Sequence, residues 1–215
     1  MKLGCLGFLA LLLVLAVVFV GGASAIFLAG GMFEVPTMPR AISYTLSDGY
    51  RAQDKIFELI LRDSGRSSRH EPVLITEREV NAYVQRHLEE KEGIRLSPLV
   101  VKLWDDEIHL QGKTVLRDLF KGFPSYLLPD YLPTSALDRP VWVTVRGTIR
   151  LDRERGMASR EYTQLEVKTF SLGNQGLGAW LLSLLLGRER LQWRVPAVVE
   201  TIKVQEGAIV ISTRR

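Results

Sequence analysis

The chain of 215 residues contains a single cysteine, Cys5. Cys5 lies at the start of an apolar N-terminal run, whereas a lipidation site would follow such a run, so we interpret it as an apolar residue. The rest of the chain therefore has no disulfide, no thiolate metal site and no cysteine nucleophile. We expect its stability to come from packing alone.

Sequence motifs of catalysis are also missing. There is no G-x-S-x-G elbow, no S-x-x-K pair, no HExxH helix and no glycine-rich phosphate loop. The three histidines are His70 in an expected loop, His87 on a helix face and His109 on a strand, so no metal set is complete. We therefore expect no enzyme, no cofactor and no metal. A hydrolase whose triad assembles only in space is the weakest alternative.

The chain also lacks a strong excess of one charge. Its 28 basic and 24 acidic residues are interleaved, as in residues 151–161. Nucleic-acid binding needs a basic stripe with interleaved aromatic residues, so we predict that this chain does not bind nucleic acid. Weak attraction to anionic lipid headgroups is compatible with the net charge of +4.

The chain begins with a long apolar run. Residues 3–28 include no charged side chain. About 20 helical residues cross a hydrocarbon layer of roughly 30 Å. Lys2 favours a cytoplasmic N-terminus. Alternatively, Ala23-Ser24-Ala25 fits the cleavage site of a signal peptide. We divide the chain into an anchor or signal peptide at 1–33, a linker at 34–46 and a single extracytoplasmic domain at 47–215. We expect a single-pass cell-membrane protein, or a periplasmic or secreted one if residues 1–33 are removed.

Two helices are predicted after the linker. Ser47 or Asp48 caps a first helix that ends near Arg62, and its buried side is expected to contain Tyr50, Ile56, Phe57, Leu59 and Ile60. Thr76 and Glu79 form a capping box before a second helix, which Gly93 ends. Its expected apolar face consists of Val80, Tyr83, Val84, His87 and Leu88. Glu79, Tyr83 and His87 form a row that a catalytic site would need, but we favour a structural role.

From residue 94 the apolar period changes to two, which indicates strands. Hairpins are predicted around Asp105-Asp106-Glu107, around residues 152–156 and around Gln205-Glu206-Gly207. We expect His109 and Trp142 on solvated strand faces. The prediction is an α+β fold with an antiparallel, meander-like sheet of about six strands, curled around or packed on two to four helices.

Two later segments are unusually apolar. The first, residues 119–133, connects two hairpins and either packs on the core or forms a lid or interfacial segment. The second, residues 177–187, is too short to cross a bilayer and forms a buried or an interfacial helix. Together they supply the candidate ligand-binding residues, which are Phe120, Phe123, Tyr126, Leu127, Tyr131, Trp180, Leu181, Leu184 and Leu185.

The order of these elements resembles a family. The pattern T-E-x-E-V-N-A-Y at 76–83, the sequence L-Q-W-R-V-P at 191–196 and the closing V-x-x-I-x-V-x-x-G-x-x-V-I-S-T at 199–213 carry the resemblance. The chain looks like small membrane-anchored exported bacterial proteins of unknown function, similar to the tubular lipid-binding, BPI-like superfamily. The resemblance implies a sheet that wraps a helix and leaves an elongated apolar groove for acyl chains. It implies no individual functional residue.

The leading expectation is a membrane-anchored, extracytoplasmic, non-enzymatic protein that binds a lipid or amphiphile in an apolar groove. Its partners are then the membrane and a lipid ligand. The alternative is an assembly or interaction factor for a membrane complex of the cell envelope, which needs a protein partner and no bound lipid.

Overall fold

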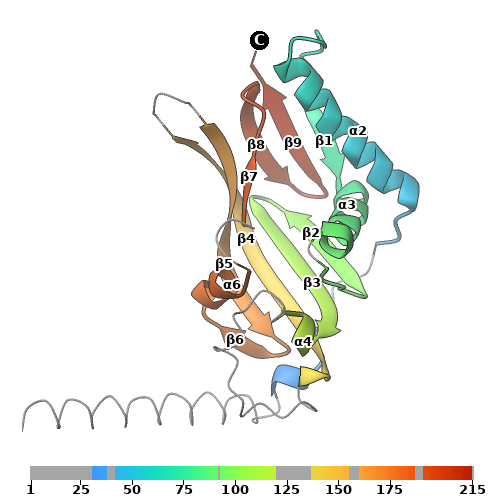
Figure 1. Ribbon diagram of the computed structural model, residues 1–215, viewed down its shortest axis with the longest axis vertical. Helices are drawn as coiled ribbons and strands as arrows, with labels where there is room; N and C mark the ends of the chain where they lie inside the picture. Colours follow the sequence, from blue (N-terminus) through green and yellow to red (C-terminus); the bar gives the residue numbers. More distant parts are fainter. Residues whose placement is uncertain are drawn as a thin grey trace, which may run out of the picture.

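The computed structural model describes residues 31–37, 42–91, 93–119, 137–154, 160–186 and 191–214. These residues form an α+β fold with antiparallel strands, as the sequence predicts (Figure 1). The expected span at 3–28 lies outside them.

Both predicted helices are present. Helix α2 spans Leu46–Asp63, and Asp48 accepts hydrogen bonds from the backbone N–H (2.7 Å) and the hydroxyl (2.8 Å) of Thr45. The cap is thus Thr45, two or three residues earlier than predicted, because Asp48 completes its box from inside the helix. Helix α3 spans Glu77–Lys91 and begins with the predicted box, in which the Thr76 N–H donates to Glu79 at 2.8 Å. Gly93 follows with φ 64°.

A six-stranded antiparallel sheet confirms the predicted meander. Its strands β2, β3, β4, β5 and β6 lie in chain order. Strand β7 pairs with residues 162–164, near the start of β5. The strand bounds are Leu99–Trp104, Glu107–Val115, Pro140–Glu154, Arg160–Leu172, Gln175–Leu177 and Gln192–Arg194 for β2 to β7. The predicted first hairpin turns at Asp105-Asp106, with Asp106 at φ 61°.

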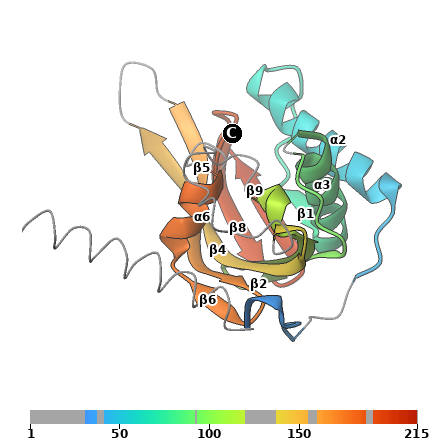
Figure 2. The ribbon, with the colours of Figure 1, turned by 60° about the horizontal axis from the view of Figure 1, so that its bottom comes forward.

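A second sheet was not predicted. Its strands β1 (Val73–Thr76), β9 (Ala208–Thr213) and β8 (Val199–Gln205) pair in that order. The sequence predicts the β8–β9 hairpin, but β1 is only four residues long and its partner lies far along the chain. The turns of the two sheets meet, because the Asp106 N–H donates to the Val204 carbonyl at 3.0 Å. Figure 2 shows α2 and α3 side by side next to β1.

The outer side of α2 differs from the prediction. Leu59 is buried and Ile56 is partly buried, as predicted, but Tyr50, Phe57 and Ile60 are 58%, 55% and 49% exposed. The side of α2 that faces α3 is instead small or polar. Gly49 allows close packing there, since a Cβ at its position would lie 3.5 Å from the Ala82 side chain.

Two strand side chains are less solvated than predicted. The His109 side chain is 14% exposed and meets the Trp104 ring edge-on, with centroids 4.0 Å apart. Trp142 is 8% exposed. The sheet face that the sequence pattern assigned to water is therefore partly covered, because alternation records polarity and not what packs on the strand.

Candidate functional site

The structure separates the predicted ligand-binding residues. Phe120, Phe123, Tyr126, Leu127 and Tyr131 lie outside the described residues. Helix α6 spans Ala179–Leu186, and the side chains of Leu184 and Leu185 also lie outside the description. Trp180 is 64% exposed, whereas its neighbours Leu181 and Leu182 pack on the core. The helix is thus not enclosed on every side at Trp180.

The short helix η1 (Gly31–Phe33) is fixed at one end of the molecule. The Asn174 N–H donates to the Gly31 carbonyl at 2.8 Å, and the Asn174 amide donates to Glu34 at 2.7 Å. Met32 is completely buried in the core. Gly173 has φ 56°, and a Cβ there would collide with the carbonyl oxygens of Gly31 and Met32. The turn between β5 and β6 therefore holds η1 in place.

Helix α4 (Leu116–Leu119) ends beside η1. The Arg139 guanidinium lies 3.8 Å from the centre of the Phe33 ring, a cation–π contact. The Arg139 carbonyl accepts the Leu116 N–H at 3.2 Å. The chain leaves the described part at Leu119 and re-enters it at Leu137, on the same side.

Together η1, α4, β6 and α6 form what we call the apolar end, at the bottom of Figure 1. Each apolar part of the sequence attaches here. Residues 3–28 precede η1, the apolar segment 119–133 lies in the sequence between the end of α4 and β4, and α6 follows β6 after Gly178. Arg214 lies toward the opposite end, where its N–H donates to the Val198 carbonyl at 2.8 Å.

The polar residues that crowd into α3 have structural partners. Glu77 accepts hydrogen bonds from the Lys102 ammonium and the Leu103 N–H, each at 2.9 Å. Asn81 is 1% exposed and bonds to the backbone of Val101. His87 stacks on Tyr83, with centroids 5.8 Å apart. Two members of the row that suggested catalysis, Tyr83 and His87, thus contact each other.

Glu79 pairs with α2 and not with the other members of that row. Both of its oxygens accept the Lys55 ammonium at 2.8 Å. Burial raises the pKa of Glu79, but the hydrogen bonds from Lys55 and from the Thr76 N–H outweigh it, so that the pKa is lowered. Glu79 is therefore a charged carboxylate that fastens α3 to α2.

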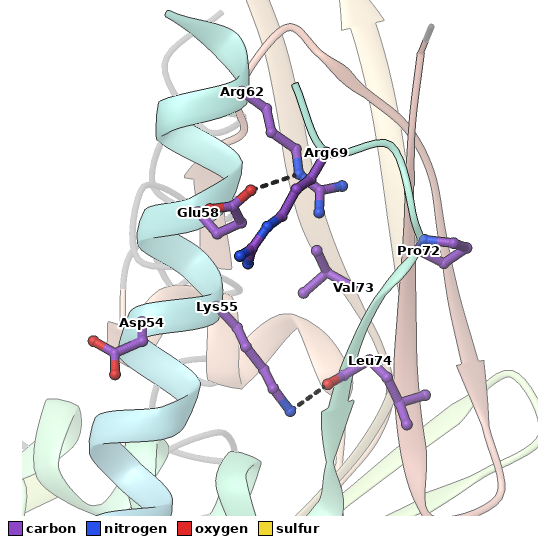
Figure 3. Close-up of a pocket in the computed structure, with 8 residues that line it drawn as sticks. All are labelled: Asp54, Lys55, Glu58, Arg62, Arg69, Pro72, Val73 and Leu74. Atoms are coloured by element: carbon purple, nitrogen blue, oxygen red, sulfur yellow. Dashed lines mark hydrogen bonds and ion pairs between the residues drawn. The ribbon is translucent and has the colours of Figure 1, made fainter. Parts of the chain in front are cut away.

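A charged cleft opens between α2 and β1 (Figure 3). It has a volume of about 460 Å³ and is lined by Asp54, Lys55, Glu58, Arg62, Arg69, Pro72, Val73 and Leu74. Lys55 and Arg62 donate to the carbonyls of Leu74 and Glu71, each at 2.7 Å. They thereby cover the free edge of β1.

A second, smaller cleft of about 250 Å³ lies between the two sheets. Its lining residues are Asp106, Thr148, Ile149, Arg150, Lys168, Ile202 and Val204. At its rim, Glu107 accepts hydrogen bonds from Lys168 (2.7 Å) and His109 (3.0 Å), which lower the Glu107 pKa to about 2. Charged side chains line both of these clefts, so neither is the predicted apolar groove. The groove stays a prediction.

Within the described ranges, no group of three or more His, Cys, Asp or Glu side chains is placed to hold a metal ion. None of the helices in this same part of the chain has the length and apolar character needed to cross a membrane.

No family model, curated protein or solved structure matches the chain. The resemblance to tubular lipid-binding proteins therefore stays a prediction. Sequence reasoning also missed the charged cleft, because Lys55, Arg62 and Arg69 meet only after α2 packs beside β1. The basic loop GRSSRH at 65–70 is the only local signal of this cleft, and by itself it predicts no more than a solvated loop.

Proposed function

We propose that this is a non-enzymatic, membrane-associated protein that binds a lipid or amphiphile at its apolar end. The observation that carries the proposal is the attachment of all three apolar sequence segments at that end. The described residues next to these segments are far apart in sequence, and the fold brings them to one end. Covering their apolar side chains with acyl chains gives about 25 cal/mol for each Å² removed from water.

Trp180 supports an interfacial role for this end. Its side chain is 64% exposed while Leu182, two residues later, is 5% exposed. One side of α6 is thus held by the core and another is available to a ligand. Tryptophan favours the boundary between apolar and aqueous phases, because its ring is apolar and its N–H is a donor.

The finer parts of the proposal rest on the sequence. The apolar run at 3–28 anchors the protein or acts as its signal peptide, and the rest of the chain lies outside the cytoplasm. Residues 31–33, which the sequence pattern groups with this run, belong to the folded domain, because Met32 is buried in its core. The antiparallel sheet curls around its helices and leaves a groove for acyl chains, as the resemblance implies. The apolar end is then the mouth through which a lipid enters from the bilayer.

Native mass spectrometry with lipid extraction tests this function. The protein to use is residues 31–215, because Met32 is completely buried and a later start would remove it from the core. Purified without detergent from a bacterial envelope, it is expected to retain about one lipid or amphiphile per chain. A folded protein that gives only the ligand-free mass would reject the proposal.

A second function is favoured by one observation, the apolar stripe on the outer side of α2. This stripe consists of Leu46, Tyr50, Phe57 and Ile60, which are between 49% and 80% exposed. Exposed apolar patches of this kind mark protein interfaces. An assembly factor for an envelope complex would use it to bind a protein partner. Co-purification of that partner with no bound lipid would favour this alternative. The partner should then be lost in Phe57→Ser and retained in Trp180→Ser.

A further inference from the structure

Arg69 has no hydrogen bond or ion pair through its guanidinium to any described residue, although it lines the charged cleft. In Figure 3 its side chain points into the cleft, between Glu58 and Lys55, whereas Asp54 points away from it. An arginine has five N–H donors in a planar fork, which matches two oxygens of a phosphate. The cleft therefore contains an unused anion-binding group.

Three other charged side chains of the cleft, Lys55, Glu58 and Arg62, have hydrogen-bond partners. Glu58 accepts the Arg62 Nε–H at 3.2 Å and the Ser67 hydroxyl at 2.6 Å. Lys55 is held by Glu79 and the Leu74 carbonyl. Glu58 and Glu79 thus bond to Arg62 and Lys55, whereas Arg69 lies close enough to Glu58 to help lower its pKa but makes no hydrogen bond to it. An anion that enters meets the unbonded Arg69 guanidinium with two further cations close by.

The cleft is also held rigid. The Arg62 side chain is only 6% exposed, and its Nη1 donates to the carbonyl of Glu71 and to the hydroxyl of Thr213. The loop that carries Arg69 is fixed by Ser67, whose hydroxyl bonds to Glu58 and accepts the Arg69 backbone N–H at 3.4 Å. A prearranged site loses less conformational entropy when its ligand binds.

From this geometry we propose that the cleft between α2 and β1 binds a phosphate group, with Arg69 as its direct contact and Lys55 and Arg62 as supporting charges. The volume of about 460 Å³ admits a phosphate together with a small organic group. Pro72, Val73 and Leu74 give that group an apolar wall. The phosphate belongs either to a soluble compound or to a lipid headgroup.

This site is separate from the apolar end and does not rest on the proposed function. Arg62 contacts Thr213 of β9, so the cleft lies toward the end of the molecule that carries Arg214. A lipid that reached the cleft would have to be presented on a second surface or extracted from the bilayer.

Calorimetric titration of the full chain in phosphatidylcholine nanodiscs tests the site. The probes are inorganic phosphate, glycerol 3-phosphate and, in a separate arm, added vesicles that contain phosphatidylglycerol. We expect saturable binding that Arg69→Gln weakens about tenfold, which is about 1.4 kcal/mol. Arg69→Lys should retain part of the affinity, because it keeps the charge and loses the fork. Arg66→Gln is the matched control, since Arg66 is exposed on the same loop and does not line the cleft.

The outcomes separate clearly. Binding of the soluble probes assigns the phosphate to a soluble compound, whereas binding of the vesicles alone assigns it to a lipid headgroup. No saturable binding of any probe would overturn the proposal. An equal loss in Arg66→Gln and Arg69→Gln would also overturn it, because the effect would then be one of net charge. Thermal unfolding of each variant, expected to be unchanged, shows that a loss of binding is not a loss of folding.

Discussion

Asn81 and Val101 are joined by two hydrogen bonds. The Asn81 amide donates to the Val101 carbonyl and its oxygen accepts the Val101 N–H, each at 2.7 Å. The same amide also donates to the Glu77 carbonyl at 2.7 Å, and the side chain is 1% exposed. A helix side chain thus acts as a strand partner for β2, which fixes α3 against the six-stranded sheet.

Asn81→Ala is expected to destabilise the fold by about 3 kcal/mol, because it leaves buried polar groups of Val101 and Glu77 without partners. Urea unfolding measures the change. Arg78→Ala is the control on the same helix, where Arg78 is exposed, and it should stay within about 0.5 kcal/mol. Equal effects in the two variants would contradict the role of the Asn81 contacts.

Glu79→Gln is expected to change how stability depends on pH. The pKa of Glu79 in the folded protein is lowered from 4.5, so its carboxylate contributes stability above pH 4.5 that is lost as the pH falls further. The variant should be less stable than the wild type near pH 7, and this difference should shrink at about pH 3. Urea unfolding at both values checks it. A difference that grows on acidification would have the wrong sign.

Two adjacent residues test the burial of α2. Leu59→Ala should cost about 3 kcal/mol, since Leu59 is 3% exposed in the core. Ile60→Ala should cost less than about 1 kcal/mol, because Ile60 is 49% exposed. Chemical denaturation of the two variants gives the comparison. A large cost at Ile60 would mean that the outer stripe is covered in the native protein.

Gly173→Ala should detach η1 from the turn between β5 and β6. The added Cβ would collide with two carbonyl oxygens of η1, in addition to the cost of positive φ. Gly207→Ala is the matched control, because Gly207 also has positive φ, 76°, but open space around it. We expect about 1 kcal/mol at Gly207 and at least twice that at Gly173 by thermal unfolding. Similar costs in the two variants would show that the contact between Gly173 and η1 does not contribute to stability.

Trp180→Ser should lower the lipid retained by residues 31–215 severalfold, because it removes the largest exposed apolar side chain of α6. Trp193→Ser is the control, since Trp193 is 44% exposed on β7. Lipid extraction and native mass spectrometry give the ratio. Equal losses in the two variants would point to general surface hydrophobicity instead of the apolar end.

Local patterns predicted the elements that local interactions determine. The Thr76–Glu79 box, the stop at Gly93 and the turns at Asp105-Asp106 and Glu206-Gly207 need only neighbouring residues, and the structure confirms them. The antiparallel order of β2 to β6 follows because each strand pairs with the next one.

Features that depend on distant partners were not predictable from one sequence. Strand β1 exists because β9, more than 130 residues later, pairs with it. The outer position of Phe57 depends on which side of α2 packs on α3, where Gly49 meets Ala82, and periodicity alone does not give that choice. The charged cleft likewise needs a helix, a loop and a strand at once.

The pairing of β1 also constrains the order in which the chain can fold. Among the described strands, β1 has only β9 as a neighbour, so its four residues stay unpaired during synthesis until β9 leaves the ribosome. Helix α2 also gains one of its contacts only after β9 is made, because Arg62 donates a hydrogen bond to Thr213. Loss of β9 would therefore leave β1 without a strand partner and loosen the end of α2, whereas α3 would keep its hydrogen bonds to β2. Damage at the end of the described chain would thus be felt first near its beginning.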